Sequence, residues 1–178
     1  MNDPKIKTIS FDIFDTLLVR PCIHPKDIYY LIDRKAKELY NVDFIDLRWS
    51  AGQELNNPNA TIFDVWDYIR KKNKLSKSLM NQLIELEIDC ESNLLTARKI
   101  GKELYEYAVL TGKRIIAISD MYLPRKVLQD ILIKNGFTKL SQVYISCDCS
   151  VRKDSGELYD YVLQKENIKK QFTVSYWR

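Results

Sequence analysis

The chain has 178 residues and a formal net charge of +4, with 46% hydrophobic and 29% charged residues, the balance of a folded globular protein rather than a disordered tail. Basic residues are spread among acidic ones, which argues against a nucleic-acid-binding surface, and no apolar run approaches the ~20 residues that span a bilayer. The opening MNDPKIK lacks a signal-peptide core, so we expect a cytoplasmic protein.

The first apolar segment, 6–14 (IKTISFDIF), is rich in β-branched and aromatic residues and predicts a buried strand. Asp12 and Asp15 lie at its C-terminal end. From His24 to about Tyr40 apolar residues recur with helical spacing, which predicts a helix. The chain therefore opens with one strand followed by a helix.

Residues 24–92 are expected to be almost entirely helical, interrupted by a polar loop over 52–61 that ends at Thr61, a candidate helix N-cap. The acidic run at Glu85, Glu87 and Asp89 is expected to form a solvated helix face.

The second half of the chain alternates helices and strands. In order, it predicts a helix over 97–110, a strand over 114–119, a helix after Pro124, a strand over 142–147, a helix over 155–165 and a strand from 172. This alternation is typical of an α/β fold with a Rossmann-like parallel sheet. We expect an α/β core made of 1–22 and 93–178, with 23–92 as a helical cap insertion.

Polar residues follow three of these strands, where parallel sheets place their ligands. They are Asp12 and Asp15 after the first strand, Ser119 and Asp120 at the second, and Arg152 and Lys153 after the third. A carboxylate nucleophile, a hydroxyl and a cationic amine suit group transfer to an aspartate. The alternative for each is a local role, as a turn residue, a loop hydroxyl or a solvated charge.

Four cysteines (Cys22, Cys90, Cys147 and Cys149) form no CxxC pair, and the single histidine, His24, lies far from the last two in sequence. Reduced structural thiols are favoured over a zinc site. With one histidine, catalysis has to depend mainly on carboxylates, lysine and hydroxyls.

Taken together, the stretches SFDIFDTLL, RIIAISD and RKDSGELYDYV resemble the haloacid dehalogenase (HAD) superfamily, mostly phosphohydrolases that form an aspartyl-phosphate. The helical block sits where that family carries its cap. More narrowly, SFDIFDTLLVRP with SDMYLP is similar to bacterial HAD hydrolases found beside polysaccharide-biosynthesis glycosyltransferases. The resemblance implies a small phosphorylated metabolite, such as a sugar phosphate, as substrate, and a glycosyltransferase or a second copy of the chain as partner.

Residue by residue, the resemblance makes Asp12 the nucleophile and a ligand of Mg²⁺, together with the backbone carbonyl of Phe14. Thr16 takes the family's threonine position, Ser119 the phosphate-holding hydroxyl and Lys153 the third-motif lysine.

Asp120 and Arg20 border this predicted site. Either contacts the substrate or makes a local salt bridge.

Two departures from the family pattern affect the predicted activity. Phe14 stands where the family's phosphatases carry a second aspartate that protonates the leaving group, and Asp15 replaces it only if the backbone turns there. Residues 176–178 (YWR) stand where a fourth, acidic motif would complete the Mg²⁺ site. We therefore expect a C-terminally truncated chain, with weakened metal binding and with either modest stability or pairing to another chain.

Three functions follow from this comparison. The first is a Mg²⁺-dependent phosphatase, weakened or inactive if the fourth motif is missing. The second is a catalytically incomplete HAD-fold binding module. The third is a metal-independent haloacid dehalogenase that uses Asp12.

Overall fold

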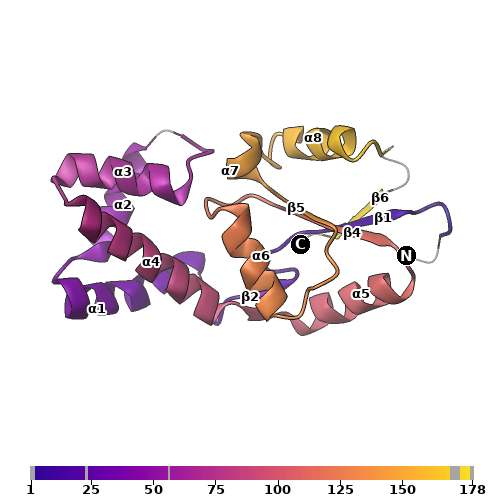
Figure 1. Ribbon diagram of the computed structural model, residues 1–178, viewed down its shortest axis with the longest axis horizontal. Helices are drawn as coiled ribbons and strands as arrows, with labels where there is room; N and C mark the ends of the chain where they lie inside the picture. The colour runs from indigo at the N-terminus through magenta and orange to yellow at the C-terminus, as the bar shows by residue number, and fades with distance from the viewer. Residues whose placement is uncertain (1–2, 23, 56, 169–172, 177–178) are drawn as a thin grey trace. The chain divides into compact units, whose positions relative to one another are not determined.

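The computed structural model describes residues 3–22, 24–55, 57–168 and 173–176. The chain divides into two compact units, one formed by the segments up to Val19 and from Leu95 onward, the other by Arg20–Leu94 (Figure 1). The first unit contains the sheet and the second consists of helices. Each unit has its own core.

The first unit is built on a four-stranded parallel sheet with the order β5-β4-β1-β6. The strands are β1 (Thr8–Phe11), β4 (Arg114–Ser119), β5 (Gln142–Ile145) and β6 (Thr173–Tyr176). All four residues of β1 are buried, as a strand between two neighbours requires. The predicted α/β fold with a parallel sheet is confirmed.

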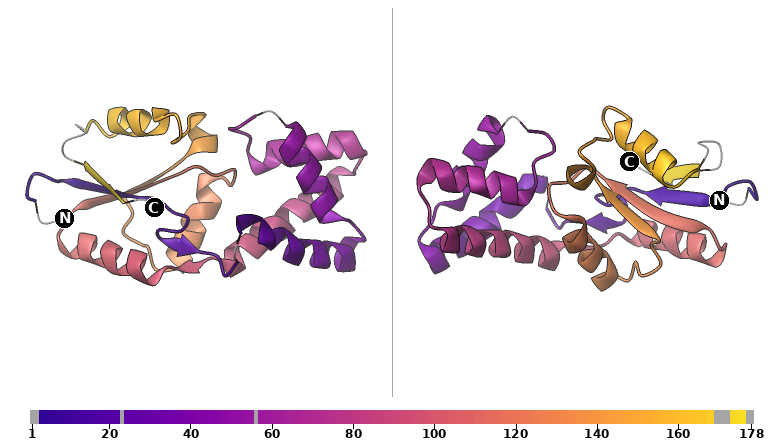
Figure 2. Two further views of the ribbon diagram at one scale, coloured as in Figure 1. Left: turned by 180° about the vertical axis from the view of Figure 1, so that it is seen from behind. Right: turned by 45° about the horizontal axis from the view of Figure 1, so that its top comes forward.

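Helices cover both faces of this sheet. The helices α5 (Lys99–Leu110) and α6 (Arg125–Lys134) lie on one face and α8 (Glu157–Lys165) lies on the other (Figures 1 and 2). On the α8 side, a buried cluster joins residues of β4 to residues of α8: Ile116, Ile118, Leu158 and Val162. Burying β-branched and leucine side chains on both faces fixes the sheet and therefore the positions of its strand ends.

Several predicted boundaries differ from the structure. The first strand ends at Phe11, because the chain turns immediately afterwards. Ser146–Cys149 forms a short helix, α7, where the sequence predicted the end of a strand. A two-stranded antiparallel ribbon of β2 (Leu18–Val19) and β3 (Thr96–Ala97) was not predicted, since two residues are too short to show a period.

The second unit consists of a short 3₁₀ turn, η1 (Pro25–Asp27), and the helices α1 (Ile28–Tyr40), α2 (Phe44–Glu54), α3 (Ile62–Asn73) and α4 (Lys77–Leu94). Thr61 caps α3 as predicted: its Oγ1 accepts the Asp64 N–H at 3.2 Å, and the Asp64 carboxylate accepts the Thr61 N–H at 2.9 Å. The predicted loop begins too early, because α2 continues to Glu54. No described helix has the length and apolarity needed to cross a membrane.

The acidic run on α4 is not a uniformly solvated face, which corrects the sequence-based expectation. Glu85 and Asp89 are exposed, but Glu87 is fully buried. Its carboxylate pairs with Arg48 at 2.8 Å and accepts the Trp66 indole N–H at 2.8 Å. A buried carboxylate needs such partners, and the sequence pattern alone does not show that an arginine on another helix supplies them.

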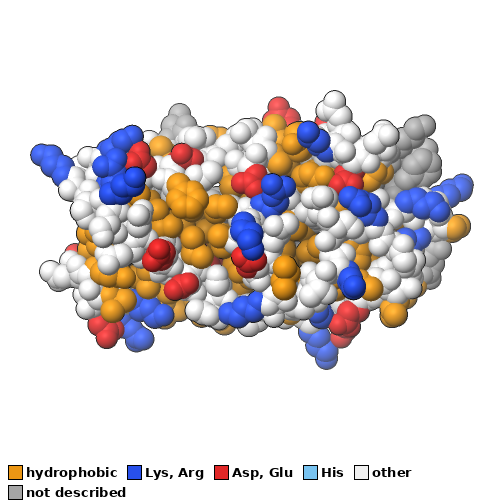
Figure 3. All heavy atoms as spheres, viewed as in Figure 1, with side chains coloured by type: hydrophobic (Ala, Val, Ile, Leu, Met, Phe, Trp, Pro, Cys, Tyr) orange, Lys and Arg blue, Asp and Glu red, His pale blue; other side chains and the backbone are white. Residues whose placement is uncertain are grey.

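Charges of both signs are interspersed on the face of the molecule seen in Figure 3, where lysines and arginines lie among aspartates and glutamates. This mixture on the visible face agrees with the spread of basic residues along the sequence.

Candidate active site

The carboxyl ends of β1 and β4 place the predicted site residues at one edge of the sheet. β1 and β4 pair in parallel with Phe11 opposite Ala117, so Asp12 follows β1 close to the level at which β4 ends in Ser119. Asp120 is the next residue, and Lys153 lies in the loop between α7 and α8. The fold therefore brings three separate chain segments to this edge.

Lys153 and Asp12 form an ion pair, with Nζ 2.8 Å from Oδ1. The two side chains are 17% and 20% exposed, so the pair is partly shielded but reachable from solvent. Oδ1 also accepts the backbone N–H of Ile13 at 2.8 Å. Oδ2 accepts no hydrogen bond from the described residues. One oxygen of Asp12 is thus fixed, and the other remains available to an incoming group.

The chain reverses sharply after Asp12. The carbonyl of Ile13 accepts the N–H groups of both Leu17 (2.9 Å) and Leu18 (2.8 Å), and Asp15 adopts a left-handed conformation with φ of +57°. The sequence left open whether the backbone turns at Asp15, and the structure shows that it does. The Asp15 side chain is exposed.

This turn is supported from outside by α5 and the residue before it. Arg98 donates from its backbone N–H to the Leu17 carbonyl and from Nη1 to the Asp15 carbonyl, both at 2.8 Å. Gly101 packs so tightly that a Cβ there would lie 1.9 Å from the Thr16 carbonyl oxygen. Thr16 itself is 7% exposed. Thr16 thus lies in a tightly packed turn that follows Asp12 in the chain.

Ser119 is the last residue of β4 and is 1% exposed. Its neighbour Asp120 accepts the backbone N–H of Lys153, at 3.0 Å to Oδ1 and 3.2 Å to Oδ2. The Arg152 guanidinium lies 3.7 Å from the same carboxylate and also pairs with Asp154. Asp120 thus contacts the loop that carries Lys153.

Tyr159, in the first turn of α8, was not singled out by the sequence. It is half-buried and packs against the cluster that joins β4 to α8. Burial raises the pKa of its phenol, and the charges of Asp12 and Asp120 raise that pKa further.

Arg20 is engaged inside the helical unit. Its Nε and Nη2 each lie 3.0 Å from an oxygen of Glu91 on α4, and Glu91 is 2% exposed. Burial raises the pKa of Glu91, while the Arg20 guanidinium acts in the opposite direction. The sequence left two roles open for Arg20, a substrate contact or a salt bridge. The structure shows a salt bridge, and it is largely buried.

The carboxylate at Asp12 fits a Mg²⁺ ion whose other ligands include water and phosphate oxygens. It does not fit a site in which protein side chains supply every ligand. No three His, Cys, Asp or Glu side chains among the described residues gather as a metal site. Mg²⁺ usually needs only one or two carboxylates, because water and phosphate oxygens complete its octahedron. Asp12, with Oδ2 accepting no hydrogen bond from the described part of the chain, offers such a carboxylate. Trp177 and Arg178, at the expected fourth motif, lie outside the described residues.

All four cysteines are free thiols. Burial raises the pKa values of Cys90 and Cys149 and raises that of Cys147 to about 12. Thiols with raised pKa values are protonated and unreactive at neutral pH, which fits the structural role predicted for them.

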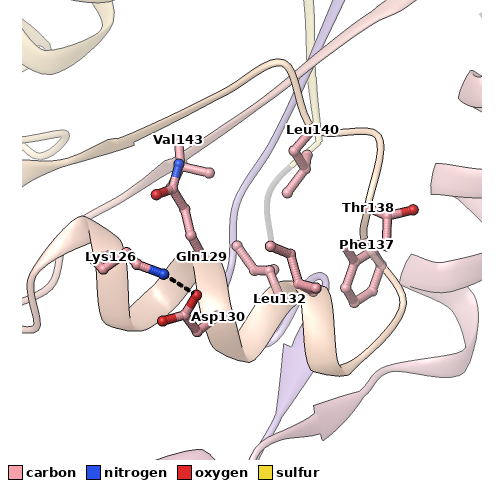
Figure 4. Close-up of a pocket in the computed structure, with 9 residues that line it drawn as sticks. Lys126, Gln129, Asp130, Leu132, Phe137, Thr138, Leu140 and Val143 are labelled. Carbon is pink, nitrogen blue, oxygen red and sulfur yellow. Dashed lines mark hydrogen bonds and ion pairs between the residues drawn. The ribbon is translucent and has the colours of Figure 1, made fainter.

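Two hollows in the molecule are separate from the Asp12 site. One, of about 210 Å³, lies against α6 and β5 and is lined mainly by apolar residues, with the Lys126–Asp130 ion pair at its rim (Figure 4). The other, of about 450 Å³, lies in the helical unit and includes Tyr30 and Trp49. Neither is lined by Asp12, Ser119 or Lys153.

The fold and the strand-end carboxylates define an α/β protein of the Rossmann-like class with a helical insertion. No protein-family profile matches the chain, and no curated protein matches it. Solved structures do match, but their sequence identities to this chain are so low that the comparison shows the fold alone.

The chain is similar in structure to a protein assigned as a β-phosphoglucomutase from Thermotoga maritima, with a TM-score of 0.64 and 15% identity over 96% of this chain and 75% of that one. It is also similar to a HAD family enzyme from Bacteroides thetaiotaomicron in complex with magnesium and inorganic phosphate (TM-score 0.59, 14% identity, 96% and 83% covered). A third is the L-2-haloacid dehalogenase of Xanthobacter autotrophicus (TM-score 0.56, 16% identity, 96% and 69% covered). The chain thus has the fold of HAD-family hydrolases.

Proposed function

We propose that this chain is a HAD-type phosphohydrolase that acts on a small phosphorylated metabolite through an aspartyl-phosphate on Asp12. The observation that carries the proposal is the Lys153–Asp12 ion pair of 2.8 Å at the carboxyl end of β1. The amine lies beside the Asp12 carboxylate and would offset negative charge that gathers when a phosphate group approaches.

In the first step an oxygen of the Asp12 carboxylate attacks phosphorus and forms the new O–P bond, while the bond from phosphorus to the substrate's ester oxygen breaks and the leaving oxygen takes a proton from water. In the second step water attacks the phosphoryl group and gives up a proton to solvent, the bond between phosphorus and the Asp12 oxygen breaks, and inorganic phosphate leaves. The Ser119 hydroxyl would hold a phosphoryl oxygen, and the Lys153 amine would balance charge in both steps. These are the roles that the sequence resemblance implies for the same residues.

A bound Mg²⁺ would be held by the Asp12 carboxylate and the Phe14 backbone carbonyl and would neutralise charge on the transferring phosphoryl group. The support for this assignment is the carboxylate at Asp12 and the magnesium and phosphate in the Bacteroides thetaiotaomicron enzyme of the same fold. The proposed substrate class, a phosphate monoester such as a sugar phosphate, rests on the sequence resemblance.

Phe14 favours a second candidate, a HAD-fold module that binds a phosphorylated ligand without turnover. A phenylalanine cannot protonate a leaving alkoxide, and general acid catalysis is typically worth ~10²–10⁴-fold. The exposed Asp15, one residue further in the turn, is the nearest acid in sequence that could take that role.

The test is phosphate release by the full chain from sugar phosphates and p-nitrophenyl phosphate, with Mg²⁺ and with EDTA. We expect Mg²⁺-dependent release that Asp12→Asn abolishes, while Asp130→Asn, on the exposed face of α6, leaves it unchanged. Absence of turnover with thermal stabilisation by inorganic phosphate would instead support the binding module. Chloride release from a 2-haloacid without metal would support the dehalogenase.

A further inference from the structure

The loop that carries Lys153 is shaped by its own hydrogen bonds. The Gly156 N–H donates to the Lys153 carbonyl at 3.0 Å, and the Leu158 N–H donates to the Arg152 carbonyl at 2.9 Å. The Ser155 N–H donates to its neighbour Asp154 at 2.8 Å. Gly156 has a φ of +84°, which a glycine adopts without strain. These bonds fix the shape of the loop but not its position against the sheet.

The backbone N–H of Lys153 points out of this loop, to Asp120. Both oxygens of Asp120 lie within hydrogen-bonding distance of that N–H, at 3.0 and 3.2 Å, and the Arg152 guanidinium lies 3.7 Å away. Asp120 directly follows β4, which is paired on both sides, with β1 and with β5. A rigid strand end thus holds the loop at the residue that supplies the amine.

We propose that Asp120 is a positioning residue, which holds the backbone of Lys153 so that its amine reaches Asp12. A lysine has a flexible four-carbon stem, so fixing its backbone narrows the space that its ammonium group samples. Asp120 thereby acts through Lys153 and not on the substrate. The proposal rests on the proposed function only in that it takes Asp12 as the nucleophile.

The first test measures the loop without using activity. In the full chain, Asp120→Ala is expected to speed amide hydrogen exchange at Lys153 by at least about tenfold, because the N–H loses its acceptor. Reductive methylation of the Lys153 amine is expected to accelerate as well. Asp120→Asn keeps an acceptor oxygen and should behave like the native chain, as should the control Asp130→Asn on α6, which lies outside this loop. Unchanged exchange in Asp120→Ala would overturn the proposal.

The second test separates positioning from substrate contact. With p-nitrophenyl phosphate, Asp120→Ala is expected to lower kcat by about tenfold to a hundredfold with little change in KM, because the amine is misplaced. Asp120→Asn should restore most of kcat. If Asp120→Asn were as impaired as Asp120→Ala and KM rose in both, the charge would contact substrate or metal, and the proposal would be wrong.

The two proposals fail in different ways. If the native chain releases phosphate from none of the esters, the proposed function is wrong, yet hydrogen exchange and methylation still decide the role of Asp120.

Discussion

The Lys153 ammonium lies 2.8 Å from Oδ1 of Asp12, although the two residues come from opposite ends of the chain. The parallel pairing of β1 with β4 and the packing of α8 on β4 bring them together. In the proposed reaction Lys153 would supply positive charge beside the Asp12 nucleophile. Replacement by methionine, which keeps the length of the stem, is expected to lower kcat by ~10²–10³-fold.

Phosphate-release kinetics measure this effect, and Lys126→Met on α6 is the control, since it removes an exposed lysine from a surface ion pair. An unchanged kcat in Lys153→Met would contradict the role given to the amine.

Phe14 offers a test of the missing general acid. Phe14→Asp places a carboxyl group where the family's phosphatases have one, and we expect kcat to rise by at least about tenfold on an alkyl phosphate, whose alkoxide needs a proton. On p-nitrophenyl phosphate, whose leaving group needs none, we expect little change. Equal effects on both substrates would show that residue 14 does not govern proton donation.

Gly101 has no room for a side chain, because a Cβ would lie 1.9 Å from the Thr16 carbonyl. Gly101→Ala is therefore expected to lower the free energy of unfolding by about 1–3 kcal/mol, since backbone must shift. The matched control is Gly52→Ala in α2, where the added methyl meets no atom within 4 Å and helix propensity should add about 0.5–1 kcal/mol. Urea unfolding measures both; equal stability of the two variants would contradict the packing described for α5.

The Arg20–Glu91 pair should stabilise the helical unit as long as both partners are present. Arg20→Ala leaves a buried carboxylate without its cation and is expected to cost about 3 kcal/mol at neutral pH. The deficit has a defined pH dependence. Burial raises the pKa of Glu91 in the folded chain above its ordinary value of 4.5, and loss of Arg20 raises it further.

A carboxyl group with a raised folded pKa is destabilising above that pKa, and the penalty disappears as falling pH protonates it. Urea unfolding should therefore show a smaller deficit at pH 5 than at pH 7.5. The double variant Arg20→Met/Glu91→Leu should recover most of the stability, and a deficit independent of pH would show that the lost packing of Arg20, not the charge of Glu91, is responsible.

Cys147 should resist alkylation in the folded protein. Burial raises its pKa to about 12, so the reactive thiolate is scarce at pH 8. Iodoacetamide labelling with peptide mass spectrometry should show slow modification of Cys147 in the native chain and rapid modification in urea. Equal rates in both states would contradict its burial.

The longer elements of the fold could be predicted from the sequence, and the shortest ones could not. The strand over 114–119 was predicted to the residue because a buried parallel strand is a continuous apolar run. The α7 turn and the β2–β3 ribbon were not predicted, since each is too short for periodicity to show. The predicted unit boundaries at 22 and 92 compare with 19 and 94 in the structure.

Site residues at strand ends could be predicted, because parallel pairing alone brings the carboxyl ends of the strands to one edge of the sheet. The partners of Glu87, Arg20 and Asp120 could not, because each depends on a contact between distant segments that leaves no pattern in the sequence.

The proposed reaction passes through a phosphate group bound covalently to Asp12, which mass spectrometry detects. The 178-residue chain is mixed with a phosphate ester that it hydrolyses, quenched in acid and digested, and the peptide containing Asp12 is examined by mass spectrometry. We expect a phosphorylated aspartate at position 12 that is absent from Asp12→Asn. Steady phosphate release by Asp12→Asn, or turnover with the phosphoryl group on another residue, would contradict it.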